Sequence, residues 1–118
     1  PIGPGPAYND RHIWLPQLFL ESMRAGQAMI ENREFTGCIL EGPALLLPLN
    51  GCVFDGCDMG NAHGDTRNLL VAPQGSRLTG AVPMSNCRFI RCSFVGAGFT
   101  GSPEFLEQMV KMVQGAPA

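Results

Sequence analysis

The sequence has little charge and no clear excess of either sign. Charged residues make up 15% of the 118 residues, and the formal net charge is -2 at pH 7. Non-specific binding to nucleic acid needs a clear excess of lysine and arginine, so the composition argues against it. Lys111 is the single lysine, and the other basic residues are arginines. A GC-rich genome explains this bias, and the alternative is recognition of phosphate or carboxylate by guanidinium groups.

Long apolar runs are missing as well. None approaches the roughly 20 residues of a membrane-spanning helix, and no pattern of a signal peptide is visible. The five cysteines are an odd number, unlike the even sets of disulfide-rich secreted domains. We therefore expect a cytoplasmic protein without a membrane partner, whose cysteines are all thiols. A chain of this length is enough for one domain with a modest core.

Two segments have apolar residues at the three- and four-residue spacings of amphipathic helices. The first is 15–31, in which Pro16 fits the first turn and the small Ser22 and Gly26 leave a notch for packing. The second is 103–114, where Ser102 is a good N-cap and Pro103 occupies the first helical position. Residues 1–9 are rich in proline and glycine, which predicts a flexible lead-in.

A five-residue pattern fills much of the chain between these helices. Each cysteine stands two residues before a large apolar residue. The units read REFTG, CILEG and PALLL over 33–47, CVFDG and CDMGN over 52–61, and CRFIR, CSFVG and AGFTG over 87–101. Neither the helical period of 3.6 nor the strand period of 2 produces a period of five. Residues 60–86 lack the pattern and form an irregular insert, in which 69–71 and 78–82 read as ordinary strands.

These units resemble the pentapeptide-repeat family, whose pattern is a small residue, a polar residue, Leu or Phe, and two polar residues. The resemblance covers about 40 residues and implies a right-handed four-sided β-helix whose central residues and cysteines point inward. We therefore expect a mainly β single domain, 1–118, in which a short β-helix over 33–101 is capped by the two helices. A small α+β sheet is the alternative. The expected outward positions are Arg33, Glu34, Glu41, Asp55, Asp58, Arg88 and Arg91.

The cysteines are not expected to bind metal. Their spacing of five residues, as in Cys52 and Cys57, differs from the usual zinc spacing, and the nearby residue that could complete a site is His63. As small buried wall residues they would also be inert as nucleophiles. The sequence thus predicts no metal site, no cofactor and no catalytic cysteine.

The most polar segment, 58–68, is the best candidate for a functional site. It places His63, Asp65 and Arg67 in a glycine-rich loop, where His63 could act as a base or bind phosphate with Arg67. The alternative is a loop whose Asp and Asn side chains bond their own backbone. The predicted ligand-binding set is completed by the outward Arg88 and Arg91.

His12 and Trp14 precede the first helix. We expect Trp14 to anchor that helix against the β structure. The alternative is an exposed aromatic ring, beside Arg11, that stacks on a nucleobase.

Three functions are compatible with these features. The first is a non-catalytic interaction or scaffold module that forms a homo-oligomer and contacts another protein. The second is a binding protein for a small anionic ligand, such as a nucleotide, at an oligomer junction. The third is an enzyme that uses His63 and Asp65 as acid–base groups, although the sequence shows no nucleophile, metal set or phosphate-binding loop to accompany them.

Overall fold

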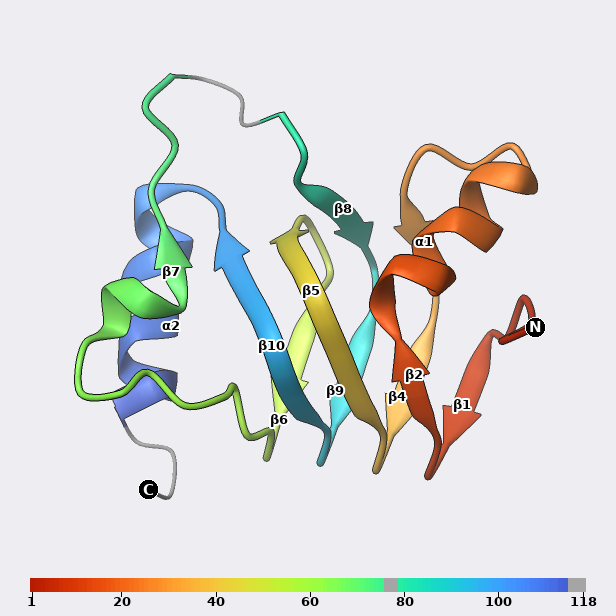
Figure 1. Ribbon diagram of the computed structural model, residues 1–118, viewed down its shortest axis with the longest axis horizontal. Coiled ribbons are helices and arrows are strands. Elements are labelled where there is room, and N and C mark those ends of the chain that lie inside the picture. The colour runs from red at the N-terminus through yellow and green to blue at the C-terminus, as the bar shows by residue number, and fades with distance from the viewer. Residues whose placement is uncertain (76–78, 115–118) are drawn as a thin grey trace.

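The computed structural model describes residues 1–75 and 79–114 and arranges them in two sheets and two helices (Figure 1). The first sheet has four short strands in the order β1-β4-β9-β6. Their bounds are β1 Ala7–Asn9, β4 Glu34–Thr36, β9 Arg88–Ile90 and β6 Val53–Asp55. All of their pairings are parallel.

The second sheet is built around its two longest strands, β5 (Ile39–Pro48) and β10 (Ser93–Thr100). β2 (His12–Trp14) pairs with the first part of β5, and β8 (Val82–Ser85) pairs with its last part. β3 (Ile30–Glu31) extends the sheet beyond β8, and β7 (Leu70–Val71) joins the end of β10. These pairings are parallel too, so in each sheet the paired strands run in the same direction.

A column of stacked aromatic rings fills the space between the sheets. The ring centroids of Tyr8, Phe35, Phe89 and Phe54 follow one another at 5.0, 5.1 and 4.9 Å, with interplanar angles of 12° or less. The stack forms because these residues are the central residues of the strands of the first sheet and are paired in register. Phe99 of the second sheet meets Phe54 edge-on.

The burial of most five-residue units agrees with the expected inward positions, but the third unit is out of phase, because Leu46 is buried and the expected central residue Leu45 is half-buried. The central residues Phe35, Leu40, Met59, Phe89, Phe94 and Phe99 are at most 2% exposed. Cys38, Cys87 and Cys92 are buried, whereas Cys52 and Cys57 are half-buried. The inward orientation of the buried cysteines is therefore confirmed.

The predicted right-handed β-helix is wrong. Each coil of a solenoid contacts only its neighbours along the chain, whereas β9 lies between β4 and β6, and β10 lies between β5 and β7. In addition, β5 is 10 residues long and β10 is 8, so both continue past the corners that five-residue units require. The protein is an α/β arrangement of two helices and two sheets of parallel strands. The predicted alternative, a small α+β sheet, fits this arrangement.

The two helices lie toward opposite edges of the sheets, with α1 beside β2 and α2 beside β7 (Figure 1). α2 spans Pro103–Gln114, as predicted, and the Ser102 hydroxyl accepts a hydrogen bond from the N–H of Phe105. α1 spans Leu15–Arg24 and is shorter than the predicted 15–31. Gly26 has a φ of +84°, so the chain leaves the helix there, and residues 30–31 form β3 instead.

Residues 1–9 are bound to the fold rather than flexible as predicted. They contain β1, and the N–H groups of Ile2 and Gly3 donate hydrogen bonds to the Glu21 carboxylate on α1. These two backbone donors lower the pKa of Glu21 to about 2, which keeps the carboxylate ionised at neutral pH. The proline and glycine residues of this segment thus indicated an irregular backbone, but they did not indicate a segment without contacts to the fold.

The irregular insert 60–86 contains more regular structure than predicted. It includes a 3-10 helix, η1 (Thr66–Asn68), as well as β7 and β8. The predicted strand at 69–71 corresponds to β7. The predicted strand at 78–82 begins at Leu78, outside the described residues, and β8 starts at Val82. No helix in the described ranges is long and apolar enough to cross a membrane.

Candidate functional site

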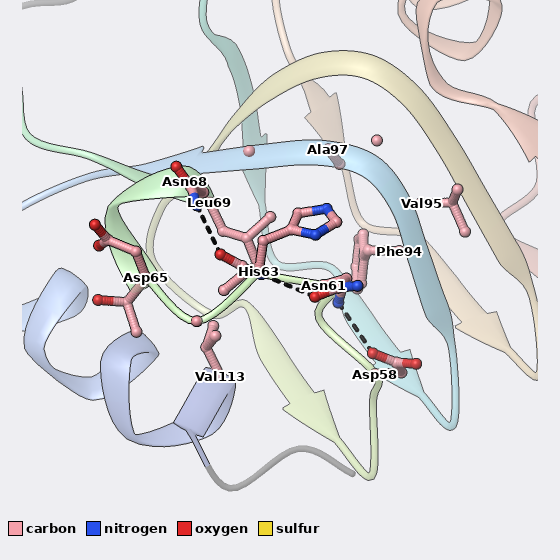
Figure 2. A pocket seen from close by; sticks show the side chains of 16 residues that line it. Asp58, Asn61, His63, Asp65, Asn68, Leu69, Phe94, Val95, Ala97 and Val113 are labelled. Carbon is pink, nitrogen blue, oxygen red and sulfur yellow. Dashed lines mark hydrogen bonds between the residues drawn. The ribbon is translucent and has the colours of Figure 1, made fainter. Parts of the chain in front are cut away.

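A pocket of about 920 Å³ lies along the edge of β10, between two points at which that edge is paired. At one end Asp58 bridges Ser93, and at the other β7 pairs with Phe99. Between these points the chain leaves the sheet as the loop 59–68 and returns at Leu69. The loop, the middle of β10 and Val113 of α2 line the pocket (Figure 2).

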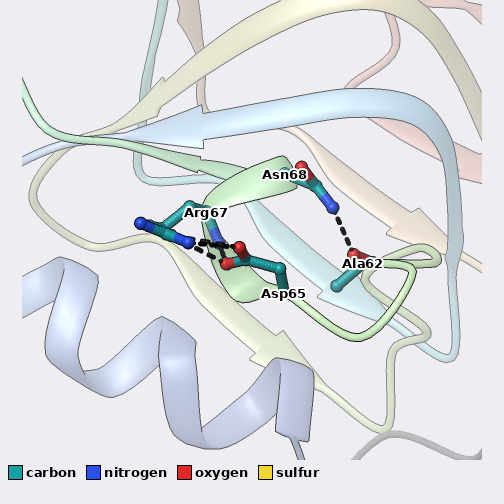
Figure 3. Close-up of polar contacts among 4 residues, drawn as sticks. All are labelled: Ala62, Asp65, Arg67 and Asn68. Carbon is teal, nitrogen blue, oxygen red and sulfur yellow. Dashed lines mark hydrogen bonds and ion pairs between the residues drawn. The ribbon is translucent and has the colours of Figure 1, made fainter.

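The loop is shaped by short polar side chains that bond to its own backbone. The Asp58 carboxylate accepts a hydrogen bond from the N–H of Gly60 at 3.0 Å, and the side-chain Oδ1 of Asn61 accepts one from the N–H of His63 at 2.8 Å. The Asn68 amide donates to the Ala62 carbonyl at 2.7 Å, which ties the two ends of the loop together (Figure 3). These bonds are those of the predicted alternative, in which Asp and Asn satisfy the loop backbone.

Asp65 and Arg67 form an exposed ion pair beside the pocket. The carboxylate of Asp65 caps η1 by accepting the N–H of Arg67, and it also receives the guanidinium group at 2.6 Å (Figure 3). These hydrogen bonds lower the pKa of Asp65 to about 2. Asp65 is therefore ionised at neutral pH, with its carboxylate already occupied by Arg67.

Among the residues that line the pocket, His63 is the one with a basic side chain. It has a φ of +51°, an arrangement that the Asn61 hydrogen bond holds in place. In Figure 2 its imidazole projects from the loop toward the β10 side of the pocket, where Phe94, Ala97 and Leu69 form an apolar wall. The pocket thus combines the His63 imidazole and the carboxylates of Asp58 and Asp65 with apolar side chains and the bare backbone of Gly96 and Gly98.

The structure does not bring the predicted arginines to this pocket. Arg67 is bound to Asp65 and does not line the pocket, and its side chain is 88% exposed. Arg88 lies on β9 in the first sheet, 3.9 Å from Glu34, and Arg91 follows the same strand. Only His63 and Asp65 of the five predicted residues line the pocket. The reason is the sheet order, which separates β9 from the loop.

Arg33 is the polar residue that the sequence pattern misplaced. It was expected to face solvent, yet it is only 7% exposed. Its guanidinium group donates to the Tyr8 hydroxyl at 2.8 Å, the Ser22 hydroxyl at 3.1 Å and the Gln27 side chain at 3.3 Å. Ser22 lies in the apolar stripe of the first helix, so its notch receives an arginine. Ser22, a small polar residue in that apolar stripe, was the one signal in the sequence for the burial of Arg33.

Trp14 also differs from its expected role. Its ring is 51% exposed, and its N–H donates to the Gly42 carbonyl at 3.2 Å. It therefore lies on the outer surface of the second sheet instead of anchoring the helix. This exposed position agrees with the alternative prediction of an exposed aromatic ring. The stacking of that ring on a nucleobase remains a prediction.

Comparisons with protein-family models, with curated proteins and with solved structures found no significant match to the chain.

Proposed function

We propose that the protein is a non-catalytic interaction module that self-associates through the outer face of the second sheet. The supporting observation is the set of apolar side chains on that face. Trp14, Ile39, Val95 and Val71 are 51%, 43%, 51% and 41% exposed. The alternation of side chains places all four opposite the core, because their neighbours Ile13, Leu40, Phe94 and Leu70 point inward.

The rest of this apolar face continues along β5. Pro43 is exposed and Leu45 and Leu47 are half-buried. Pro83 of β8 is paired beside Leu47. Polar side chains beside the exposed apolar ones are those of His12 and Glu41, which bond to each other at 2.6 Å. An apolar surface whose polar groups already bond to each other is suited to contact with another protein rather than with an ion.

The occupant that we propose is a second copy of the chain. β5 has 10 residues, so its length is about 33 Å, and four neighbouring strands are about 19 Å wide, which gives a face on the order of 600 Å². A stable interface buries about 800 Å² of accessible surface on each partner. The face is therefore large enough to form most of a symmetric dimer interface. We further propose the cytoplasm as its compartment.

Val95→Glu is expected to convert the oligomer to a monomer, because it places a second carboxylate on the apolar face, opposite Glu41 in the strand register. Light scattering at micromolar concentration measures the mass. Val53→Glu is the matched control, since Val53 is similarly exposed, at 47%, but lies on the first sheet. A monomeric native protein, or an equal effect of both substitutions, would contradict this interface.

The pocket supports a second candidate, the binding of a small ligand. Its volume of about 920 Å³ is within the range of known ligand sites, and its lining combines apolar side chains with the polar side chains of the loop. Its electrostatics favour an anion less than the sequence predicted, because Asp58 lines it while Arg88 and Arg91 do not. An anion would depend on His63.

A panel of nucleotides tests this candidate by thermal unfolding. A ligand at 100 times its Kd stabilises the folded state by about 2.7 kcal/mol and raises the melting temperature. His63→Ala is expected to abolish that rise, whereas Arg88→Ala is expected to leave it unchanged. If no nucleotide shifts the melting temperature of the native protein, the pocket does not bind this class of ligand.

A further inference from the structure

Four of the five cysteines form two pairs between the chain segments that flank β6 and β9, one pair before these strands and one pair after them. Val53 is paired with Arg88, and Asp58 bridges Ser93, both in parallel register. The residue before each of these positions is a cysteine, so Cys52 lies opposite Cys87, and Cys57 lies opposite Cys92. Neighbouring strands are about 4.8 Å apart, and disulfides join residues whose Cα atoms are about 4.4–6.8 Å apart.

The two members of each pair differ in their access to solvent. Cys87 and Cys92 are at most 1% exposed. Cys52 and Cys57 are half-buried, because they flank β6, which is the last strand in the order β1-β4-β9-β6. A reagent can therefore reach the outer cysteine of each pair, and the inner cysteine lies behind it.

The outer thiols are also the more acidic ones. A hydrogen bond with the Cys87 thiol lowers the pKa of Cys52 to about 6, and a hydrogen bond with the Cys92 thiol lowers that of Cys57 to about 7. The same contacts raise the pKa of Cys87 and Cys92. The nearby charges are Asp55, which opposes ionisation of Cys57, and Arg33, which faces Cys87. The thiolate is the reactive form, so the accessible cysteine is also the nucleophile.

We propose that Cys52–Cys87 and Cys57–Cys92 are two dithiol sites that exchange with small-molecule disulfides. The outer thiolate attacks one sulfur of the disulfide, which forms a mixed disulfide and releases one small thiol. The inner cysteine then gives up its proton and attacks the protein sulfur of that bond, releasing the second small thiol. Two protein thiols are oxidised, and one small disulfide is reduced to two thiols.

The sheet geometry makes the resulting bond easy to reverse. The Cβ atoms of directly opposed residues in parallel strands are about as far apart as the strands, whereas a disulfide holds its Cβ atoms about 3.8 Å apart. Closing the bond must draw β6 toward β9. A bond formed under such strain is more readily reduced, so this site suits reversible rather than structural oxidation.

Oxidised glutathione is the probe for these sites. The full-length protein is incubated with it at neutral pH, and mass spectrometry with peptide mapping identifies the products. We expect Cys52–Cys87 and Cys57–Cys92 disulfides, each with the loss of two hydrogens, while Cys38 stays a thiol because it is 1% exposed. Added dithiothreitol should restore all thiols.

Removing the inner cysteine separates this mechanism from simple surface oxidation. In Cys87→Ser the reaction should stop at a glutathione adduct on Cys52, while the Cys57–Cys92 pair in the same molecule still closes. Cys52→Ser should leave Cys87 unmodified. Cys87→Ala serves if serine disturbs the fold, which circular dichroism would show.

Two results would overturn the proposal. One is that Cys52 and Cys57 stay unmodified in the folded protein but react after unfolding. The other is that glutathione adducts accumulate on them in the native sequence without closing to the paired disulfides. Alkylation by iodoacetamide is an independent readout, and its rate at Cys52 should reach half of its maximum at a lower pH than the usual thiol value of about 8.5, because the contact with Cys87 lowers the pKa of Cys52.

Discussion

Phe89→Ala is expected to lower the free energy of unfolding by about 3–5 kcal/mol, as large-to-small changes at buried aromatic residues do. Phe89 is fully buried and has an aromatic neighbour on each side, with Phe35 at 5.1 Å and Phe54 at 4.9 Å between ring centroids. Its removal interrupts the stack in the middle and leaves a cavity between the two sheets. Urea denaturation followed by circular dichroism measures the loss.

Phe54→Ala is the matched control for this prediction. Phe54 is at the end of the stack, is only half-buried and has one parallel stacked neighbour. The smaller loss of contacts should reduce the destabilisation, because the cost depends on the cavity that remains. An equal or larger loss for Phe54→Ala would show that the central position of Phe89 is not what matters.

Arg33→Ala is expected to cost about 2–4 kcal/mol, since hydrogen bonds to charged groups contribute about 1.5–3 kcal/mol each and do not add fully. The guanidinium group joins three parts of the chain: the Tyr8 hydroxyl on β1, Ser22 on α1 and Gln27 after that helix. Its loss removes a donor from the buried Tyr8 and Ser22 oxygens. Thermal and urea unfolding measure the effect.

Two further substitutions define the role of Arg33. Arg88→Ala removes the same side chain at an exposed site, where its carboxylate contact is 3.9 Å long, and should change stability by less than about 0.5 kcal/mol. Arg33→Lys keeps the charge but loses the planar fork, so it should restore only part of the stability. Equal effects of Arg33→Ala and Arg88→Ala would mean that the buried hydrogen bonds do not stabilise the fold.

Local features of the chain were predictable from the sequence to the extent that they depend on neighbouring residues. The five-residue spacing identified the buried Phe89 and Cys87, because strand residues separated by two positions point to the same side. Ser102 and Pro103 identified the start of α2, because capping acts within one turn. Both predictions needed only a few adjacent residues.

The order of the strands was not predictable in this way. Phe35, Phe54 and Phe89 carry nearly the same local pattern, so nothing nearby in the chain says that Phe89 lies between the other two. The burial of Arg33 depends on that same long-range arrangement, because its acceptors come from β1 and from α1. The loop 58–68 was found by its polarity, yet the sequence could not tell that its acidic and amide groups are used within the loop.

β9 and β10 each lie between two strands that precede them in the sequence. This order has a consequence for the synthesis of the chain. The strands emerge from the ribosome in the order β4, β5, β6, β7 and only later β9 and β10. Until then β6 and β7 have no partner strand of the finished sheets, since each is paired only to one of the two late strands. The first 75 residues therefore lack β9, which joins β4 to β6, and β10, which joins β5 to β7. The protein must complete its core after translation of its last third, which makes it a slow, non-local folder.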